Sequence, residues 1–94
     1  MQFLPKLRDF LYRKGGIYTV RRYRYSTTEV YVEGVGRCKR RLIRYISSLQ
    51  PYREQLSSYV EQSGFASVDE WWVAIHKFIK VGEDMWLYKV VVKK

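Results

Sequence analysis

The spacing of apolar residues divides the chain into seven segments. Leu4, Leu7 and Leu11 recur at the three- and four-residue spacing of an amphipathic helix, and Pro5 suits a first helical turn. From Ile17 onward, β-branched and aromatic residues replace this pattern, which is typical of strands. The pattern predicts helices at residues 4–13, 51–62 and 68–79, and strands at residues 17–25, 29–35, 37–46 and 85–92.

Two later segments carry additional local signals. Ser67 and Glu70 have the spacing of a capping box, in which a hydroxyl and a carboxylate satisfy amides at a helix start. Residues 85–92 are almost continuously apolar, which favours a strand in the centre of a sheet. With no repeat or linker, we expect one α+β domain over residues 1–94, in the order α-β-β-β-α-α-β.

The alternation of side chains along a strand predicts which residues share a face. Thr19 and Arg21 lie on one face of strand 17–25, because one residue separates them. Cations occur at every second position on the other face and along strand 37–46. We expect a single basic stripe that comprises Arg22, Arg24, Arg37, Lys39 and Arg41.

Charge is concentrated in the first half of the chain. The 94 residues carry 18 Lys and Arg against nine Asp and Glu, a net charge of +9. Residues 1–47 hold twelve basic and three acidic residues, whereas residues 48–94 hold six of each. A focused positive field attracts polyanions, so this distribution favours nucleic acid as the partner. The alternative is a solvated face that keeps the protein in solution.

Composition excludes several classes of protein and of binding site. No stretch approaches the ~18 apolar residues of a membrane span, and no signal peptide precedes the first charges, so we expect a cytoplasmic protein without a membrane partner. Cys38 is the single cysteine and His76 the single histidine, which leaves too few ligands for a His/Cys zinc site. We expect no metal and no other cofactor. The lack of Asn and the 29% of charged residues are typical of thermophile proteins.

Three stretches together resemble one family. Residues 14–21 (KGGIYTVR) form a glycine turn and a strand, residues 33–43 form a glycine-containing strand, and residues 63–71 (SGFASVDEW) are similar to a Gly-Phe-x-Ser-x-x-Glu segment. In this order they resemble the ASCH domains, which have a PUA-like fold. The resemblance implies a small mixed β-barrel with flanking helices. It also implies a cleft between the first strand and the late helix that binds RNA or modified nucleosides.

The resemblance also implies candidate site residues. Some members hydrolyse the amide of N4-acetylcytidine with a Lys, a Thr nucleophile and a Glu. By position, Thr19, Arg21 and Glu70 match the family's Thr, Arg and Glu. The position of the family's Lys is Gly16, and Lys14 lies two residues earlier. Because a threonine hydroxyl needs a base or nearby cation to become nucleophilic, hydrolysis stands as an alternative to binding.

Arginine and tryptophan are the side chains best suited to bind a nucleotide. The planar fork of Arg21 matches a phosphate or a base edge. On helix 68–79, Trp72 shares an apolar stripe with Ile75 and Ile79. Trp71 then lies beside this stripe, where its indole is free to stack on a base.

Two further functions fit the same residues. The two helices on either side of Gly64 have the arrangement of a winged helix-turn-helix that binds DNA, although the acidic Asp69 and Glu70 at the second helix would repel phosphate. The basic half could instead dock on an acidic protein. The sequence favours an RNA- or nucleotide-binding domain, with DNA less favoured and the oligomeric state open.

Overall fold

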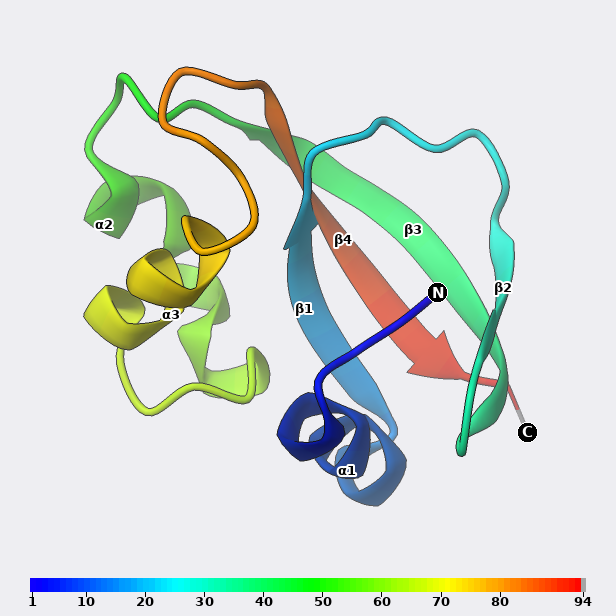
Figure 1. Cartoon of the computed structure of the whole chain (residues 1–94). Helices are drawn as coiled ribbons and strands as arrows, with labels where there is room; N and C mark the ends of the chain where they lie inside the picture. The colour runs from blue at the N-terminus through cyan, green and yellow to red at the C-terminus, as the bar shows by residue number, and fades with distance from the viewer. Residues whose placement is uncertain (94) are drawn as a thin grey trace.

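Residues 1–93 form a four-stranded antiparallel sheet and three α-helices (Figure 1). The structure, a computed structural model, describes residues 1–93. The elements in chain order are α1 (Pro5–Lys14), β1 (Gly16–Arg21), β2 (Glu29–Val32), β3 (Gly36–Ile46), α2 (Tyr52–Leu56), the 3-10 helix η1 (Ser57–Gln62), α3 (Val68–Ile75) and β4 (Met85–Val92). This sequence of elements confirms the α+β class and the predicted order of helices and strands.

The strands pair in the order β1-β4-β3-β2. The apolar strand β4 is central, as predicted: Val90 pairs with Ile17 on one side and with Arg40 on the other. All three pairings are antiparallel, so the expectation of mixed strand directions is wrong. Strands β1 and β2 are the two edges, and no pairing among residues 1–93 closes the sheet into a barrel.

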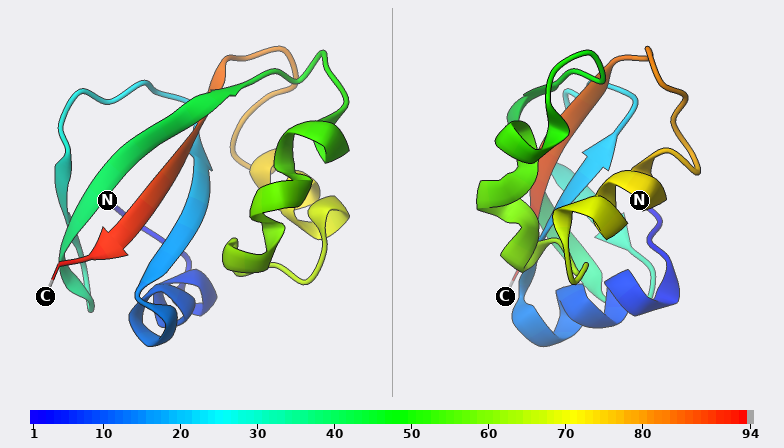
Figure 2. Two further views of the ribbon diagram at one scale, coloured as in Figure 1. Left: turned by 180° about the vertical axis from the view of Figure 1, so that it is seen from behind. Right: turned by 90° about the vertical axis from the view of Figure 1, so that its left-hand side faces the viewer.

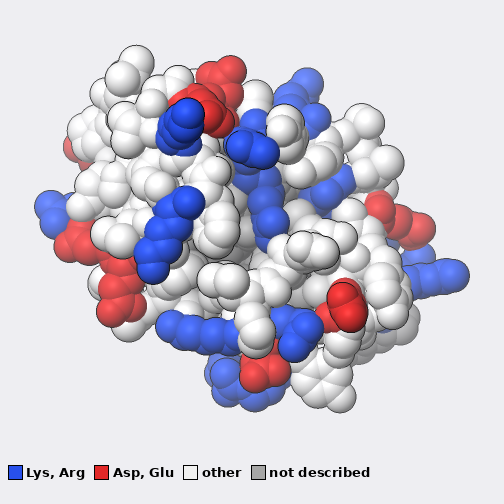
Figure 3. Space-filling view, viewed as in Figure 1, with Lys and Arg blue, Asp and Glu red and all other residues white. Residues whose placement is uncertain are grey.

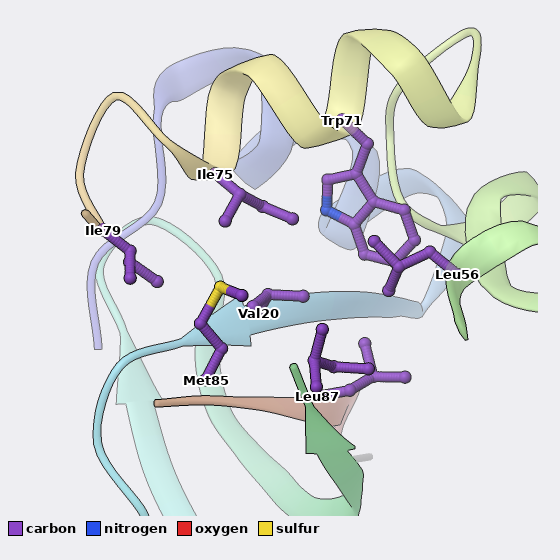
Figure 4. Packing of buried hydrophobic residues seen from close by; sticks show 8 residues of the cluster. Val20, Leu56, Trp71, Ile75, Ile79, Met85 and Leu87 are labelled. Carbon is purple, nitrogen blue, oxygen red and sulfur yellow. The ribbon is translucent and has the colours of Figure 1, made fainter. Parts of the chain in front are cut away.

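Each face of the sheet packs against a different group of helices (Figures 1 and 2). On one face, Val20 and Leu87 contact the cluster that includes Trp71 and Ile75 of α3 (Figure 4). On the other face, a second cluster joins residues of the sheet to α1 and the N-terminal segment. Its buried members are Leu11, Ile17, Val32, Cys38 and Val90.

Strand β1 ends four residues before its predicted end. The hydroxyl of Tyr88 accepts the Tyr25 amide at 2.7 Å and donates to the Tyr23 carbonyl at 2.8 Å. These hydrogen bonds hold residues 22–28 over the face of the sheet, so this segment does not continue β1 alongside β4. The second strand also stops early, at Val32, because the chain turns at Gly34 with φ +81°.

The later helices are shorter than predicted. The segment 51–62 is α-helical only as far as Leu56 and continues as the 3-10 helix η1. Helix α3 ends at Ile75, where the amides of Lys77 and Phe78 bond to carbonyls three residues earlier. The tight turn that follows returns Ile79 to the core.

Candidate functional site

A pocket of roughly 500 Å³ opens beside the edge strand β1. The N-terminal segment, β1, the residues that follow β1, and α3 form its walls. Val20, Trp71 and Ile75 belong both to its lining and to the hydrophobic core, so its floor is well packed (Figure 4). The other lining residues are Gln2, Phe3, Leu4, Pro5, Leu7, Thr19, Arg21, Arg22, Tyr23, Tyr25, Phe65, Ala74, Phe78 and Ile79.

Thr19 and Arg21 lie together in this pocket, as their spacing predicts. Nε of Arg21 donates to Thr19 Oγ1 at 3.2 Å, and Nη2 donates to the Gln2 carbonyl at 2.8 Å. The guanidinium also lies 4.7 Å from the centre of the Phe3 ring. Burial lowers the pKa of Arg21, and no carboxylate within residues 1–93 pairs with it.

Glu70 and Lys14 do not line the pocket. The Glu70 amide donates to Ser67 Oγ, as the capping box predicts, and its carboxylate accepts the Ala66 amide at 3.3 Å. Lys14 is exposed at the end of α1, beside a separate depression that includes Gly16. The candidate catalytic set is therefore dispersed, and within residues 1–93 the only side chain bonded to the Thr19 hydroxyl is the cationic Arg21.

The expected roles of the two adjacent tryptophans are reversed. Trp71 is only 2% exposed and packs in the core, whereas Trp72 is half-buried. The Trp72 ring stacks on Tyr52 of α2 at 4.7 Å with an interplanar angle of 8°. This aromatic partner from another helix holds Trp72 at the edge of the core. Trp71 therefore contributes the floor of the pocket and not an exposed stacking platform.

Three cations of the predicted stripe share one face of β3. Arg37, Lys39 and Arg41 are all exposed, at alternate positions of the strand. Two further cations join them. A register shift between Leu42 and Arg44 turns Arg44 to this face, and Lys89 of β4 pairs directly with Arg41. We call this set the basic sheet face: Arg37, Lys39, Arg41, Arg44 and Lys89.

The basic sheet face has little cover and little opposing charge. In the back view of the molecule (Figure 2, left), no helix lies over the part of β3 next to β2, whereas Lys89 of β4 contacts η1 because its Nζ donates to Gln62 Oε1 at 2.7 Å. The carboxylate of Glu29, opposite Lys39 on β2, accepts a bond from Lys93 at 2.5 Å. This hydrogen bond and the charge of Lys93 lower the pKa of Glu29. The exposed ring of Tyr31 lies on β2 opposite Arg37.

Arg22 and Arg24 lie apart from the basic sheet face, so the expectation of one stripe of five cations is wrong. Both are in residues 22–28, which turn over the face that holds Tyr88. Basic and acidic side chains are interspersed in the view of Figure 3. Sequence reasoning also missed Arg40, which is 6% exposed and bonds through Nη2 to the Thr27 carbonyl and hydroxyl.

Residues 1–93 contain no helix long and apolar enough to cross a membrane. The same residues contain no group of three or more His, Cys, Asp or Glu side chains placed to hold a metal ion. No family model matches the chain, and no curated protein or solved structure is significantly similar to it.

Proposed function

We propose that this protein is a PUA-like domain of the ASCH type that binds RNA through the basic sheet face. The observation that carries the proposal is the row of exposed cations Arg37, Lys39 and Arg41 on the part of the sheet face that the helices leave open, next to the exposed Arg44 and the half-buried Lys89. The three-part resemblance to a family of RNA and nucleoside binders supports RNA over other polyanions.

The spacing of this row suits contacts with a phosphate backbone. A strand rises about 3.4 Å per residue, so cations at alternate positions stand about 7 Å apart. Each guanidinium can hold a phosphate with two parallel hydrogen bonds. Phosphate contacts release counterions, and they give an affinity that depends on salt and little on sequence.

Three cations of this face are available for such contacts, whereas Nζ of Lys89 is already bonded to Gln62 Oε1. Among residues 1–93, no carboxylate forms an ion pair with Arg37, Lys39 or Arg41. The neighbouring carboxylate of Glu29 is already bound to Lys93. A phosphate that binds Arg37, Lys39 or Arg41 therefore does not have to displace a carboxylate of this chain, so no existing ion pair is lost on binding.

Hydrolysis of an acylated nucleoside has the least support from the geometry. Thr19 lines the pocket, but Glu70 caps α3 and Lys14 lies at the end of α1. No side chain of the described residues is placed to take a proton from the Thr19 hydroxyl, which a threonine nucleophile requires.

The test is the slope of log affinity against log salt for a single-stranded RNA oligomer. A triple variant, Arg37→Ser with Lys39→Ser and Arg41→Ser, should reduce the steepness of the slope by about 2, because each contact contributes about 0.7. The matched control removes three exposed cations elsewhere: Arg13→Ser with Lys77→Ser and Lys80→Ser.

The control variant should keep a slope close to that of the wild type. If both triple variants change the slope equally, net charge explains binding and the proposed interface is wrong. Duplex DNA and an acidic peptide are measured under the same conditions. Tighter binding of either than of RNA would favour the helix-turn-helix or the adaptor function instead.

A further inference from the structure

We infer that the pocket beside β1 binds a small organic acid, with its carboxylate on Arg21 and its apolar body between the N-terminal segment and α3. This site lies outside the basic sheet face, and the inference does not depend on RNA binding.

The size and lining of the pocket suit an apolar body. Its volume of roughly 500 Å³ lies within the range of small-molecule sites, about 300–1,000 Å³. Phe3 of the N-terminal segment and Phe78 after α3 both line it, and Trp71 and Ile75 form the floor. Phe78 is 66% exposed, so a bound molecule would cover apolar surface that now faces water.

Arg21 contributes a positive charge to this largely apolar lining. A guanidinium has five N–H donors, and Arg21 uses Nε for Thr19 and Nη2 for the Gln2 carbonyl. Its Nη1 has no partner among residues 1–93. A desolvated cation is costly to keep unless it is paired, and a carboxylate would supply both the charge and planar acceptors for the guanidinium.

Two neighbouring arginines add positive charge near Arg21 and so favour the binding of an anion. Arg22 also lines the pocket. Arg40 is buried behind Tyr25, with its guanidinium 4.0 Å from the centre of that ring. No carboxylate in residues 1–93 pairs with either arginine. Burial lowers the pKa of Arg21, and the positive charge of Arg40 adds a smaller contribution in the same direction.

The polar groups of the pocket fit a carboxylic acid better than a nucleotide. Below the rim, Thr19 is only 8% exposed, and its hydroxyl is already bonded to Arg21. Tyr23 and Tyr25 stand at the rim, 55% and 39% exposed. A nucleobase would bury several donors and acceptors against apolar walls, where each unpaired polar group opposes binding.

The probes are 4-phenylbutyrate and decanoate, each measured by isothermal titration calorimetry beside its neutral amide and beside adenosine monophosphate. We expect at least one of the two acids to bind, and its amide to bind at least about tenfold more weakly, because a charge-assisted hydrogen bond is lost. Arg21→Gln should weaken binding of the acid by a similar factor. The matched control, Arg24→Gln, removes a cation that does not line the pocket and should leave the affinity unchanged.

A second variant keeps the test valid if Arg21→Gln does not fold. Ala74→Leu adds bulk to the pocket from a helical position and leaves Arg21 in place, so it should also abolish binding. Equal binding of acid and amide, tighter binding of the nucleotide, or no binding of either acid at millimolar concentration would overturn the inference. The affinity of Arg21→Gln for RNA should match that of Arg24→Gln. A failure of the organic-acid inference can therefore be distinguished from a failure of the proposed RNA interface.

Discussion

The basic sheet face and the pocket beside β1 both depend on arginine, in opposite surroundings. Arg37 and Arg41 are exposed on an open face, whereas Arg21 is half-buried among apolar side chains. An exposed cation is strongly screened by salt and attracts any phosphate, so many such residues are needed for useful affinity. A desolvated cation is screened much less, and a single one can select an anionic ligand.

The two regions also differ in how the chain assembles them. Most of the basic sheet face comes from alternate positions of the single strand β3. The pocket gathers residues from the N-terminal segment, from β1 and the segment after it, and from α3 and the turn that follows it, which are distant in sequence. Loss of one core side chain should therefore disturb the pocket far more than the sheet face. Four substitutions test this contrast, in order of decreasing effect.

Trp71→Ala should have the largest effect. The indole is almost fully buried under α3, and its removal should lower the free energy of unfolding by about 3–5 kcal/mol. The measurement is urea denaturation, with Trp72→Ala as the control. Because Trp72 is only half-buried, its loss should be smaller.

The folded fraction of Trp71→Ala should keep RNA binding but lose binding of the organic acid, since the indole is part of the pocket floor. A larger loss of stability for Trp72→Ala than for Trp71→Ala would contradict the burial described for the two indoles.

Ser67→Ala should have an intermediate effect. The Ser67 hydroxyl accepts the Glu70 amide at the start of α3, and loss of such a cap lowers stability by about 1 kcal/mol. Glu70→Gln should cost less, because an amide oxygen can still accept the Ala66 N–H. Thermal or urea unfolding measures both variants.

Neither of these two substitutions should change the affinity for RNA or for the organic acid, because both side chains lie outside the two binding regions. A selective loss of N4-acetylcytidine turnover in Glu70→Gln would instead assign the carboxylate a catalytic role.

Local patterns predicted the parts of the molecule that depend on neighbours in sequence. The apolar run at residues 85–92 correctly placed β4 in the centre of the sheet, and Ser67 does cap α3. The shared face of Thr19 and Arg21 follows from strand alternation alone. Alternation alone does not place Arg44 on the basic sheet face, because a register shift in β3 changes which residues face the same side.

Contacts between distant segments explain the remaining errors. The apolar stripe of α3 is wide enough to accept either indole, and the stacking of Tyr52 on Trp72 leaves Trp71 to fill the core. Arg40 occupies an inward position of β3 because Thr27 supplies two acceptors and Tyr25 covers the guanidinium. Neither partnership is visible in the spacing of residues along one element.

Glu29→Gln should have the smallest effect and acts on the sheet face alone. Glu29 is exposed, and its hydrogen bond to Lys93 lowers its pKa. Its stabilising contribution is therefore present above the unfolded pKa of about 4.3 and is lost as pH falls through the lower folded value. The wild type, but not Glu29→Gln, should lose this small increment of stability when unfolding is measured between about pH 5 and pH 3.

Removal of the Glu29 carboxylate should also free Lys93 for phosphate. At neutral pH, the RNA affinity of Glu29→Gln should rise by less than about threefold, because exposed charges interact weakly in water. Glu33→Gln removes an exposed carboxylate from the turn after β2 and serves as the control. An equal rise in both variants would assign the effect to net charge, whereas a rise confined to Glu29→Gln places the RNA beside the Glu29–Lys93 pair.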